Sequence, residues 1–394
     1  MAIDYAGSRR TGVRRRRSEL AEATSFVRRL DLVLLGAVGA LVVYGLWAIA
    51  GITQNDVTGD SSLFVVRQGV FAAVGAVGLA GAALVDPDLY RRYHRPIYIG
   101  TTGLMLFVFL AAPLTRGSRR WIDLGFFRFQ PSEFGKLLFV LALAGFLAQN
   151  GRRLGEVRTM LTTLGLAAVP IMLVFIQPDF GTALVYAAAL AAVLFVAGTR
   201  WTHFAALGAI TLLGSLTVLW FLPSAGVHLL KPYQQQRLVG FTNPSSDPSG
   251  ATYNANQSRI AVGAGGVQGR GVQGATQTRL DYLPEHATDF VFASFAEQRG
   301  FVGASVLLLL YLLVVWRGLR IVALARDSFT AIAAGGIVIA FLFQVFVNVG
   351  MTMGIAPITG IPLPFVSVGG SSMIANLTAV GVLLAIHARA RAQR

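Results

Sequence analysis

Residues 30–52 read LDLVLLGAVGALVVYGLWAIAGI, a stretch with a single charged side chain. A helix needs about 20 mostly apolar residues to cross the hydrocarbon core of a membrane, and this stretch exceeds that length. The residues before it are basic and polar, but the apolar run is too long for the short core of a cleaved signal peptide. The stretch therefore predicts an uncleaved first membrane helix.

The rest of the chain has the same character. Of its 394 residues, 55% are hydrophobic and 13% are charged, whereas a soluble domain carries about 25% charged residues. The candidate spans are Leu30–Ile52, Leu63–Val85, Ile97–Leu114, Phe134–Ala148, Met160–Ile176, Thr182–Gly198, Phe204–Leu222, Gly300–Val315, Ala331–Val349 and Ser372–Ile386. We therefore predict an all-α polytopic membrane protein of about ten transmembrane helices, with a tail at 1–29 and a single transmembrane domain at 30–394.

The distribution of arginine predicts the orientation of these helices. The tail contains Arg14–Arg17, and basic loops stay on the cytoplasmic side. Ten spans then place both termini in the cytoplasm, with the tail near anionic membrane lipids. The net charge of +15 is explained by these loops, and no motif for nucleic acid is present. The chain contains no cysteine, which excludes disulfide and thiol chemistry.

The loop at 115–133 breaks this charge rule. It is predicted to lie outside the cell, yet it contains Arg116, Arg119, Arg120 and Arg128. A short loop this basic should stay inside unless something compensates. Either a span is miscounted, or these arginines bind an anionic ligand; the agreement of all the other loops favours the ligand.

Glu133 and Lys136 lie at the start of the predicted fourth span, with Ser132 as a candidate helix cap. The two charged residues are three apart and so lie on one face of a helix. One interpretation is an ion pair that anchors the end of the helix. The other is a ligand site in which Lys136 faces a phosphate and Glu133 holds the lysine, because a lysine near membrane depth is costly and usually functional.

The sequence QPDFGT at 177–182 joins the fifth and sixth spans with almost no loop. Proline, aspartate and glycine suit a tight turn, and Asp179 is placed to cap the N-terminus of the sixth span. A structural role is therefore favoured here, with Asp179 still facing the outer cavity.

The segment DYLPEHATDFVF at 281–292 is the densest in polar groups. A helix that starts at Pro284 would place Glu285 and Asp289 on one face. A carboxylate at the edge of the apolar phase suits a general base. The alternative is helix capping by Asp281 with the other groups solvated, but capping needs one carboxylate and the segment holds three.

Two further outer segments could line a ligand site. Arg259 and Arg279 flank a glycine-rich stretch whose backbone amides could hold a phosphate, although such a stretch alone is weak evidence. Prolines and glycines in PITGIPLPFVSVGGSS at 357–372, which contains Ser371, forbid a continuous helix. Irregular backbone near membrane depth is tolerated when it lines a cavity or is buried in protein, so this segment should wall a cavity. The alternative is a connector without a ligand role.

All of these segments fall on the predicted outer face, together with the long extracytoplasmic loop 223–299 between the seventh and eighth helices. Because ATP is absent there, the substrate must carry its own activation, as a polyprenyl-pyrophosphate sugar does. Glycosyl transfer then needs a base for the acceptor hydroxyl and positive charge for the departing pyrophosphate. No Walker motif, dinucleotide fingerprint or metal-ligand spacing of histidines and carboxylates is present.

The chain resembles the SEDS family, whose members RodA and FtsW are peptidoglycan glycosyltransferases. Several motifs in the family's order carry this resemblance through nearly the whole membrane region. They are Arg120-Trp121, QPSEFGK at 130–136, QPDFGT at 177–182, YNANQS at 253–258, LPE at 283–285 with TDF at 288–290, and TGIPLPF at 359–365 with GGSS at 369–372. The stretches YQQQRL at 233–238 and Thr276-Gln277 favour the RodA branch, which serves elongation, over the FtsW branch.

The resemblance implies an inverting enzyme of the bacterial cytoplasmic membrane that joins lipid II by β-1,4 linkage and releases undecaprenyl pyrophosphate. Asp289 would be the catalytic residue. Arg120, Lys136 and Arg259 or Arg279 would stabilise the leaving group, and a divalent cation, Mg²⁺ or Mn²⁺, could share that work. The implied partners are a class B penicillin-binding protein, which is a transpeptidase, and other membrane proteins of the elongation complex.

Three residues depart from the family pattern. Ala287 stands where a histidine is usual, Gln298 where a second glutamate is expected, and Val368 where the family has an aromatic residue. Two other hypotheses therefore stay open: a lipid II flippase, and a weakly active scaffold that activates a transpeptidase. A transporter should present polar groups to both sides, whereas those of this chain cluster on the outer side.

Overall fold

The structure, a computed structural model, describes residues 29–54, 56, 60, 62–113, 118–125, 127–217, 221–224 and 252–392. Three features named above lie outside the described residues: the tail with Arg14–Arg17, Arg116 and the motif at 233–238.

Ten helices of the described chain coincide with the predicted spans. They are α2 (Leu32–Ile52), α3 (Leu63–Leu84), α5 (His94–Ala111), α6 (Pro131–Gln149), α7 (Val157–Ile176), α8 (Phe180–Val196), α9 (Trp201–Leu216), α15 (Val291–Leu324), α16 (Ser328–Met353) and α17 (Gly370–Ala392). Among the described residues, seven of them (α2, α3, α6, α7, α15, α16 and α17) are long and apolar enough to cross a membrane, and α8 and most of α9 are apolar but shorter. The prediction of an all-α polytopic membrane fold is confirmed.

Shorter elements connect these helices. They are α4 (Pro87–Arg92), η1 (Gly151–Arg153), α10 (Leu222–Ser224), α12 (Tyr253–Gly265), α13 (Gly271–Gly274) and α14 (Thr276–Arg279), with the strands β1 (Ile122–Asp123) and β2 (Arg128–Phe129). The strands form an antiparallel hairpin in the basic loop before α6, with Ile122 opposite Phe129.

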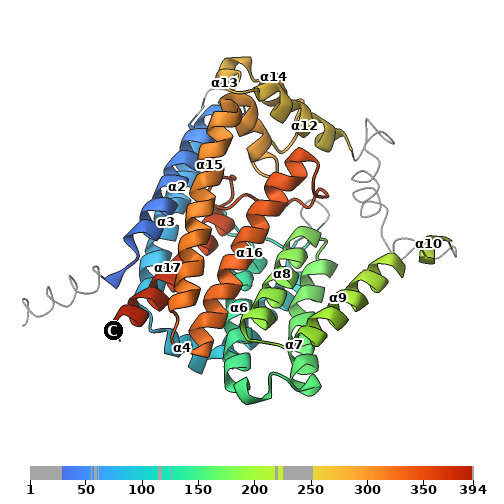
Figure 1. Cartoon of the computed structure of the whole chain (residues 1–394). Coiled ribbons are helices and arrows are strands. Elements are labelled where there is room, and N and C mark those ends of the chain that lie inside the picture. Colours follow the sequence, from blue (N-terminus) through green and yellow to red (C-terminus); the bar gives the residue numbers. More distant parts are fainter. Residues whose placement is uncertain are drawn as a thin grey trace, which may run out of the picture.

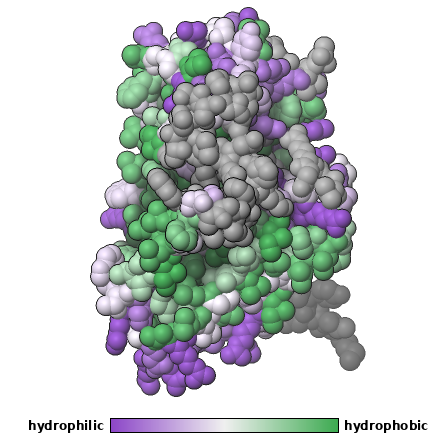
Figure 2. Space-filling view, turned by 90° about the vertical axis from the view of Figure 1, so that its right-hand side faces the viewer, coloured by the Kyte–Doolittle hydropathy of each residue, from purple (hydrophilic) through white to green (hydrophobic). Residues whose placement is uncertain are grey.

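The helices run between two polar ends of the molecule. Figure 1 shows α12, α13 and α14 at one end, and α4 with the C-terminus at the other. Most of α6, α16 and α17 is buried within the protein, whereas little of α3 and α7 is. In Figure 2, hydrophobic residues cover much of the middle of one face and hydrophilic residues gather at its two ends. This pattern is the one expected of a protein whose outer helices face lipid.

Helix α15 is broken at Gly300. Gly300 has φ 65°, in the left-handed region that favours glycine, so a short helix from Val291 is followed by the membrane-spanning part. At the break, the N–H groups of Phe301 and Val302 donate to the carbonyls of Gly266 and Val267, at 2.8 and 3.1 Å. These bonds tie the turn after α12 to α15 at its break.

Two predicted helix starts are wrong. The helix expected from Pro284 begins at Val291, because Asp281 and Glu285 both have φ 54°, a left-handed conformation that interrupts an α-helix. Ser132 does not cap α6, which begins at Pro131 with Gln130 as its N-cap residue. Proline suits the first helical position because its φ is preset and its missing N–H has no partner there in any case.

Candidate functional site

The irregular outer segments enclose a cavity of about 280 Å³. Most of its walls come from the loop before α6, the turn before α8, the segment 285–289 and the non-helical segment before α17. Its lining residues are Arg120, Trp121, Gln130, Glu133, Pro178, Asp179, Glu285, Thr288, Asp289, Thr359, Gly360, Pro362, Val368, Gly369, Gly370, Ser371 and Ser372. Six residues singled out from the sequence are among them: Arg120, Glu133, Asp179, Glu285, Asp289 and Ser371.

Asp289 is half-buried in the cavity wall, and its backbone is fixed by α16. The side-chain amide of Asn348 donates to the carbonyls of Asp289 and Ile361, at 2.9 and 2.7 Å. Asn348 is fully buried, so the two carbonyls share one donor group in the interior. This bridge sets the position of Asp289 relative to the segment before α17.

The same two segments are joined on the other side of Asp289. The Val368 N–H donates to the carbonyl of Ala287 at 3.0 Å, and the Ser367 hydroxyl donates to the carbonyl of Thr288. Phe290, immediately after Asp289, is buried against Leu283 in a small apolar cluster. Backbone bonds and packing therefore constrain the carboxylate before any ligand binds.

Glu285 lies at the open side of the cavity. Its side chain is exposed, and the hydroxyl of Thr288 donates to its carboxylate at 2.9 Å. Because Glu285 lies in the turn, its carboxylate is oriented by Thr288 and not by a helix face shared with Asp289.

Asp179 caps α8, as predicted. One of its carboxylate oxygens accepts from the Thr182 N–H at 3.1 Å. The other accepts from the Gln130 amide at 2.8 Å and lies 3.4 Å from the guanidinium of Arg120. This carboxylate therefore joins the turn before α8 to the loop before α6.

Arg120 brings positive charge to the cavity wall. Its guanidinium lies over the ring of Trp121, with 5.7 Å to the ring centroid. Its Nε is buried and has no hydrogen-bond partner among the described residues. The Arg120 side chain is 30% exposed and lines the cavity, so its guanidinium is suited to an anionic ligand that the cavity admits.

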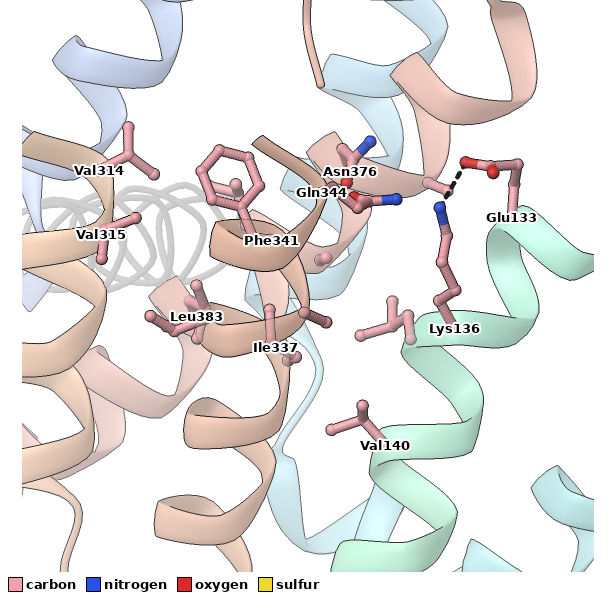
Figure 3. A pocket seen from close by; sticks show the side chains of 16 residues that line it. Glu133, Lys136, Val140, Val314, Val315, Ile337, Phe341, Gln344, Asn376 and Leu383 are labelled. Atoms are coloured by element: carbon pink, nitrogen blue, oxygen red, sulfur yellow. Dashed lines mark hydrogen bonds and ion pairs between the residues drawn. The ribbon is translucent and has the colours of Figure 1, made fainter. Parts of the chain in front are cut away.

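Glu133 and Lys136 form a buried ion pair at the base of the cavity. The Lys136 Nζ lies 2.8 Å from Glu133 Oε2, and the two side chains are 9% and 4% exposed. Figure 3 shows Lys136 extended along α6 toward Glu133, at the height of Gln344 and Asn376. The ion-pair interpretation is confirmed, and Lys136 itself does not line the cavity.

Below this pair lies a second, inner pocket of about 50 Å³ between α6, α15, α16 and α17. Glu133 lines both spaces. Apart from Glu133, Lys136, Gln344 and Asn376, the side chains around the inner pocket are apolar, among them Val140, Ile337 and Leu383 in Figure 3. The four polar side chains of the inner pocket are thus accompanied by apolar side chains from four helices.

Ser371 stabilises the cavity wall. Its hydroxyl accepts from the Gln130 N–H at 2.9 Å and donates to the carbonyl of Arg128 at 3.1 Å. These bonds pin the loop before α6 to the first turn of α17. The last helix, α17, begins at Gly370, within the GGSS motif.

The other predicted arginines lie outside the cavity lining. Arg259, on α12, donates to the side chain of Asn256 at 2.6 Å. Arg279 lies at the end of α14 and is exposed. Of the described arginines in the loop before α6, Arg119 and Arg128 are also exposed. In the described part of this loop, Arg120 alone fits the expectation that these arginines meet a ligand.

Gln298 departs from the family pattern and makes a contact that an ionised glutamate could not make. Its side-chain amide donates to the carbonyl of Gly51, at the end of α2, at 3.1 Å. The neighbouring Glu297 is fully buried, and its carboxylate accepts from the N–H of Gln277 and from the N–H and hydroxyl of Thr278, at 2.8 to 3.0 Å. This role of Glu297 was not predicted, although a carboxylate directly after the largely apolar stretch 290–296 is a signal that could have pointed to it.

His286, one place before Ala287, faces away from the cavity lining. Its Nε2 lies 3.0 and 3.1 Å from the two carboxylate oxygens of Asp56, in the loop between α2 and α3, and its Nδ1 lies 3.1 Å from the Leu283 carbonyl. Burial by itself lowers the pKa of His286, but the hydrogen bond and charge of Asp56 outweigh it, so the pKa is raised.

Asp56, Asp281 and His286 also place possible metal-ligand atoms within 4.8 Å of one another. The sequence could not reveal this group, since 225 positions separate Asp56 from Asp281. Within the described parts of the chain, the cavity carboxylates form no such group of three.

The geometry of the cavity can now be set beside known proteins. A family model described as a cell cycle protein family and named for FtsW, RodA and SpoVE matches residues 27–392. The peptidoglycan glycosyltransferase MrdB of Escherichia coli strain K12 is 36% identical over 362 residues, which cover 91% of this chain and 93% of MrdB.

Two solved structures share the fold. One is a chain from a study of how a peptidoglycan synthase complex coordinates polymerization and crosslinking; it has a TM-score of 0.77 and 30% identity, over 93% of this chain and 99% of that one. The other is the rod shape determining protein RodA of Thermus thermophilus, with a TM-score of 0.67 and 27% identity, over 91% of this chain and 96% of that one.

Proposed function

This chain belongs to the SEDS family of FtsW, RodA and SpoVE, and from that premise we propose that it is a peptidoglycan glycosyltransferase that polymerises lipid II at the outer face of the membrane. The product is a β-1,4-linked glycan strand, with undecaprenyl pyrophosphate released, and the cellular role is elongation and shape. One observation carries the proposal: Asp289 and Arg120, from two different segments, line a single cavity.

In this reaction Asp289 is the general base. The acceptor hydroxyl oxygen attacks the anomeric carbon of the donor sugar, and its proton passes to the Asp289 carboxylate. The bond from the anomeric carbon to the pyrophosphate oxygen breaks, and its electron pair leaves with the pyrophosphate. Arg120, with its unpaired buried Nε, stabilises the charge on that leaving group.

The other cavity residues hold this pair in position. Asp179 and Ser371 fix the loop that carries Arg120, and Asn348 fixes the backbone at Asp289. Glu133 and Lys136 form a buried ion pair at the base of the cavity, where Lys136 holds the Glu133 carboxylate in position. Arg259 and Arg279, which lie outside the lining, have no part in this mechanism.

The inner pocket favours this reaction over transport. A flippase would have to move the polar headgroup of lipid II past the apolar side chains that lie below Lys136. Carrying a charged pyrophosphate through such surroundings is costly. The polar groups are thus arranged for a substrate that enters and leaves on the same side.

Two further properties are part of the proposal. The arginine distribution supports cytoplasmic termini, so that the end with α12, α13 and α14 faces outward. The similarity to a chain of a peptidoglycan synthase complex supports a class B penicillin-binding protein as the partner that crosslinks the strands.

The test is polymerisation of labelled lipid II by the purified protein with its transpeptidase partner. A general base contributes about 10²- to 10⁴-fold, so Asp289→Asn should lower the rate by that factor. Asp60→Asn removes an exposed carboxylate from the loop between α2 and α3 and should leave the rate unchanged. If Asp289→Ala makes as much polymer as the natural chain, the assignment is wrong. Movement of a dye-labelled lipid across vesicles without polymer would favour the flippase instead.

A further inference from the structure

The end of the bundle opposite the cavity contains a second strongly charged space. A cavity of about 230 Å³ lies between α15 and α17, next to the start of α2. It is lined by Arg317, Arg320, Leu324, His387, Ala390 and Arg391. Three guanidinium groups and an imidazole thus converge on one space from two helices that are far apart in the sequence.

The carboxylates nearby offset only part of this charge. Asp31, the N-cap residue of α2, is bound by Arg317 through Nε and Nη2, at 3.0 and 2.6 Å. Arg320 and Arg391 form no ion pair with any carboxylate of the described residues. Asp86 and Asp88 form ion pairs with Arg389, on α17, and Arg389 does not line the cavity. Among the described residues, two positive charges are therefore left without a counter-charge.

A general excess of arginine on the cytoplasmic side does not explain this arrangement. Such arginines serve orientation equally well when they are solvated and scattered. Arg152 and Arg153, in η1, are examples, since both are exposed and neither lines the cavity between α15 and α17. Arg317, Arg320 and Arg391 instead line one shared cavity, where an anion would contact several of them at once.

The surface beside this cavity is suited to acyl chains. Trp316 is 50% exposed, and the guanidinium groups of Arg320 and Arg317 lie 5.1 and 5.6 Å from its ring centroid. Leu309, Leu312 and Leu319 are also exposed, and their spacing puts them on the face of α15 that carries Trp316. A half-exposed tryptophan between basic groups and an apolar stripe is typical of the boundary between lipid headgroups and tails.

We propose that this cavity binds the phosphate headgroup of an anionic phospholipid, with its acyl chains along the Leu309–Leu319 face of α15. A lipid with two phosphates matches the two unbalanced guanidinium groups best. Basic pockets between membrane helices on the cytoplasmic side are known to take such headgroups. Asp31 caps α2 and is bound by Arg317, which lines the cavity. The bound lipid would therefore connect the ends of α2, α15 and α17 that lie at this cavity.

The test compares two variants of the full chain in lipid nanodiscs. Arg320→Gln/Arg391→Gln removes the two unbalanced charges and keeps the buried pair of Asp31 and Arg317. Arg152→Gln/Arg153→Gln removes the same charge on the same side and is the matched control. Native mass spectrometry counts the bound lipid after transfer from nanodiscs of phosphatidylcholine alone, or with phosphatidylglycerol or cardiolipin.

We expect the natural chain and the control to retain anionic lipid and the cavity variant to lose it. Each basic group near an anionic surface is worth roughly a fivefold change in affinity, so the double variant should bind about thirtyfold more weakly. If both double variants lost bound anionic lipid equally, the effect would come from net charge and not from this cavity, and the proposal would be overturned. The proposal would also be overturned if the natural chain retained phosphatidylcholine as well as it retains the anionic lipids.

A second measurement separates a lipid from a free anion and does not depend on the variants. The unfolding temperature of the natural chain in detergent should rise with added cardiolipin and not with inorganic phosphate. An equal rise with inorganic phosphate would show that the cavity takes a free anion and not a lipid. Neither measurement uses polymerisation, so their outcome is independent of the proposed enzymatic function.

Discussion

Gly360 lies against the carboxylate of Asp289. A Cβ on residue 360 would stand 3.1 Å from Asp289 Oδ2, and Gly360 has φ 71°. This glycine therefore allows the backbone of the segment before α17 to approach the proposed base more closely than any other residue could.

Gly360→Ala should lower polymerisation strongly. The methyl group would displace the Asp289 carboxylate, and a displacement of about 1 Å can cost about 100-fold in rate. Gly198→Ala is the control, since Gly198 has φ 82° with no atom within 4 Å of the added Cβ. Both variants should lose about 1–2 kcal/mol of unfolding free energy from left-handed strain. Equal activity of the two variants would show that the contact with Asp289 does not matter.

Asn348 should act as a positioning residue. Asn348→Leu leaves the buried carbonyls of Asp289 and Ile361 without their donor, which should cost about 1–3 kcal/mol of stability for each. The maximal rate should fall more than the apparent affinity for lipid II, because the base moves while most of the cavity remains. Asn150→Leu, at the far end of α6, removes a side-chain bond to the Phe146 carbonyl and should change stability alone. A fall confined to affinity would contradict this role.

The ion pair of Glu133 and Lys136 can be measured by a double-mutant cycle. Breaking a buried pair by removing one partner typically costs about 3–5 kcal/mol, because the other charge stays buried. Glu133→Gln and Lys136→Met should each lower the unfolding temperature in detergent more than the double variant does. Strictly additive losses would mean that the two charges do not depend on each other.

The contact between His286 and Asp56 should make stability depend on pH. The pKa of His286 is raised, so the contribution of its charged form is fully present below about pH 6.5 and is lost as the pH rises through the raised pKa. The unfolding temperature should therefore fall between about pH 6 and pH 9. In His286→Gln this slope should disappear, and a slope of equal size there would assign it to another group.

The absence of cysteine in the sequence allows the orientation to be tested directly. Leu124→Cys, in the exposed loop between β1 and β2, should react with an impermeant maleimide added to intact cells stripped of their outer layers. Arg153→Cys, in η1, should react only after the membrane is opened. The opposite result would invert the proposed topology.

The membrane spans were predictable because the signal is local: a helix in lipid needs a long apolar run within one segment. The cap at Asp179 and the pair of Glu133 and Lys136 were predictable for the same reason, since each depends on residues three apart. The start of α15 was not, because the turn before it depends on left-handed residues that no composition rule reveals.

The sequence also could not show which polar residues meet across the fold. Asn348, like Gln344, is a polar residue in an apolar span, which is a signal of function or packing, but its partner carbonyls come from two other segments. The contact of His286 with Asp56 joins residues 230 positions apart. Arg259 and Arg279 were predicted to bind the ligand from their positive charge and the glycine-rich stretch between them. Neither feature specifies the direction in which an arginine side chain points.

The apolar side chains below Lys136 have a consequence for the cell as a whole. A membrane enzyme of cell wall synthesis must admit water to its substrate without letting ions leak across the bilayer and dissipate the ion gradient. In this protein the barrier to ions consists of the apolar side chains below the cavity, between α6, α15, α16 and α17. Such a barrier needs no moving gate. In the proposed orientation, water and ions that enter the cavity therefore meet an apolar layer below Lys136, which limits ion leakage and so helps the cell to keep its membrane potential.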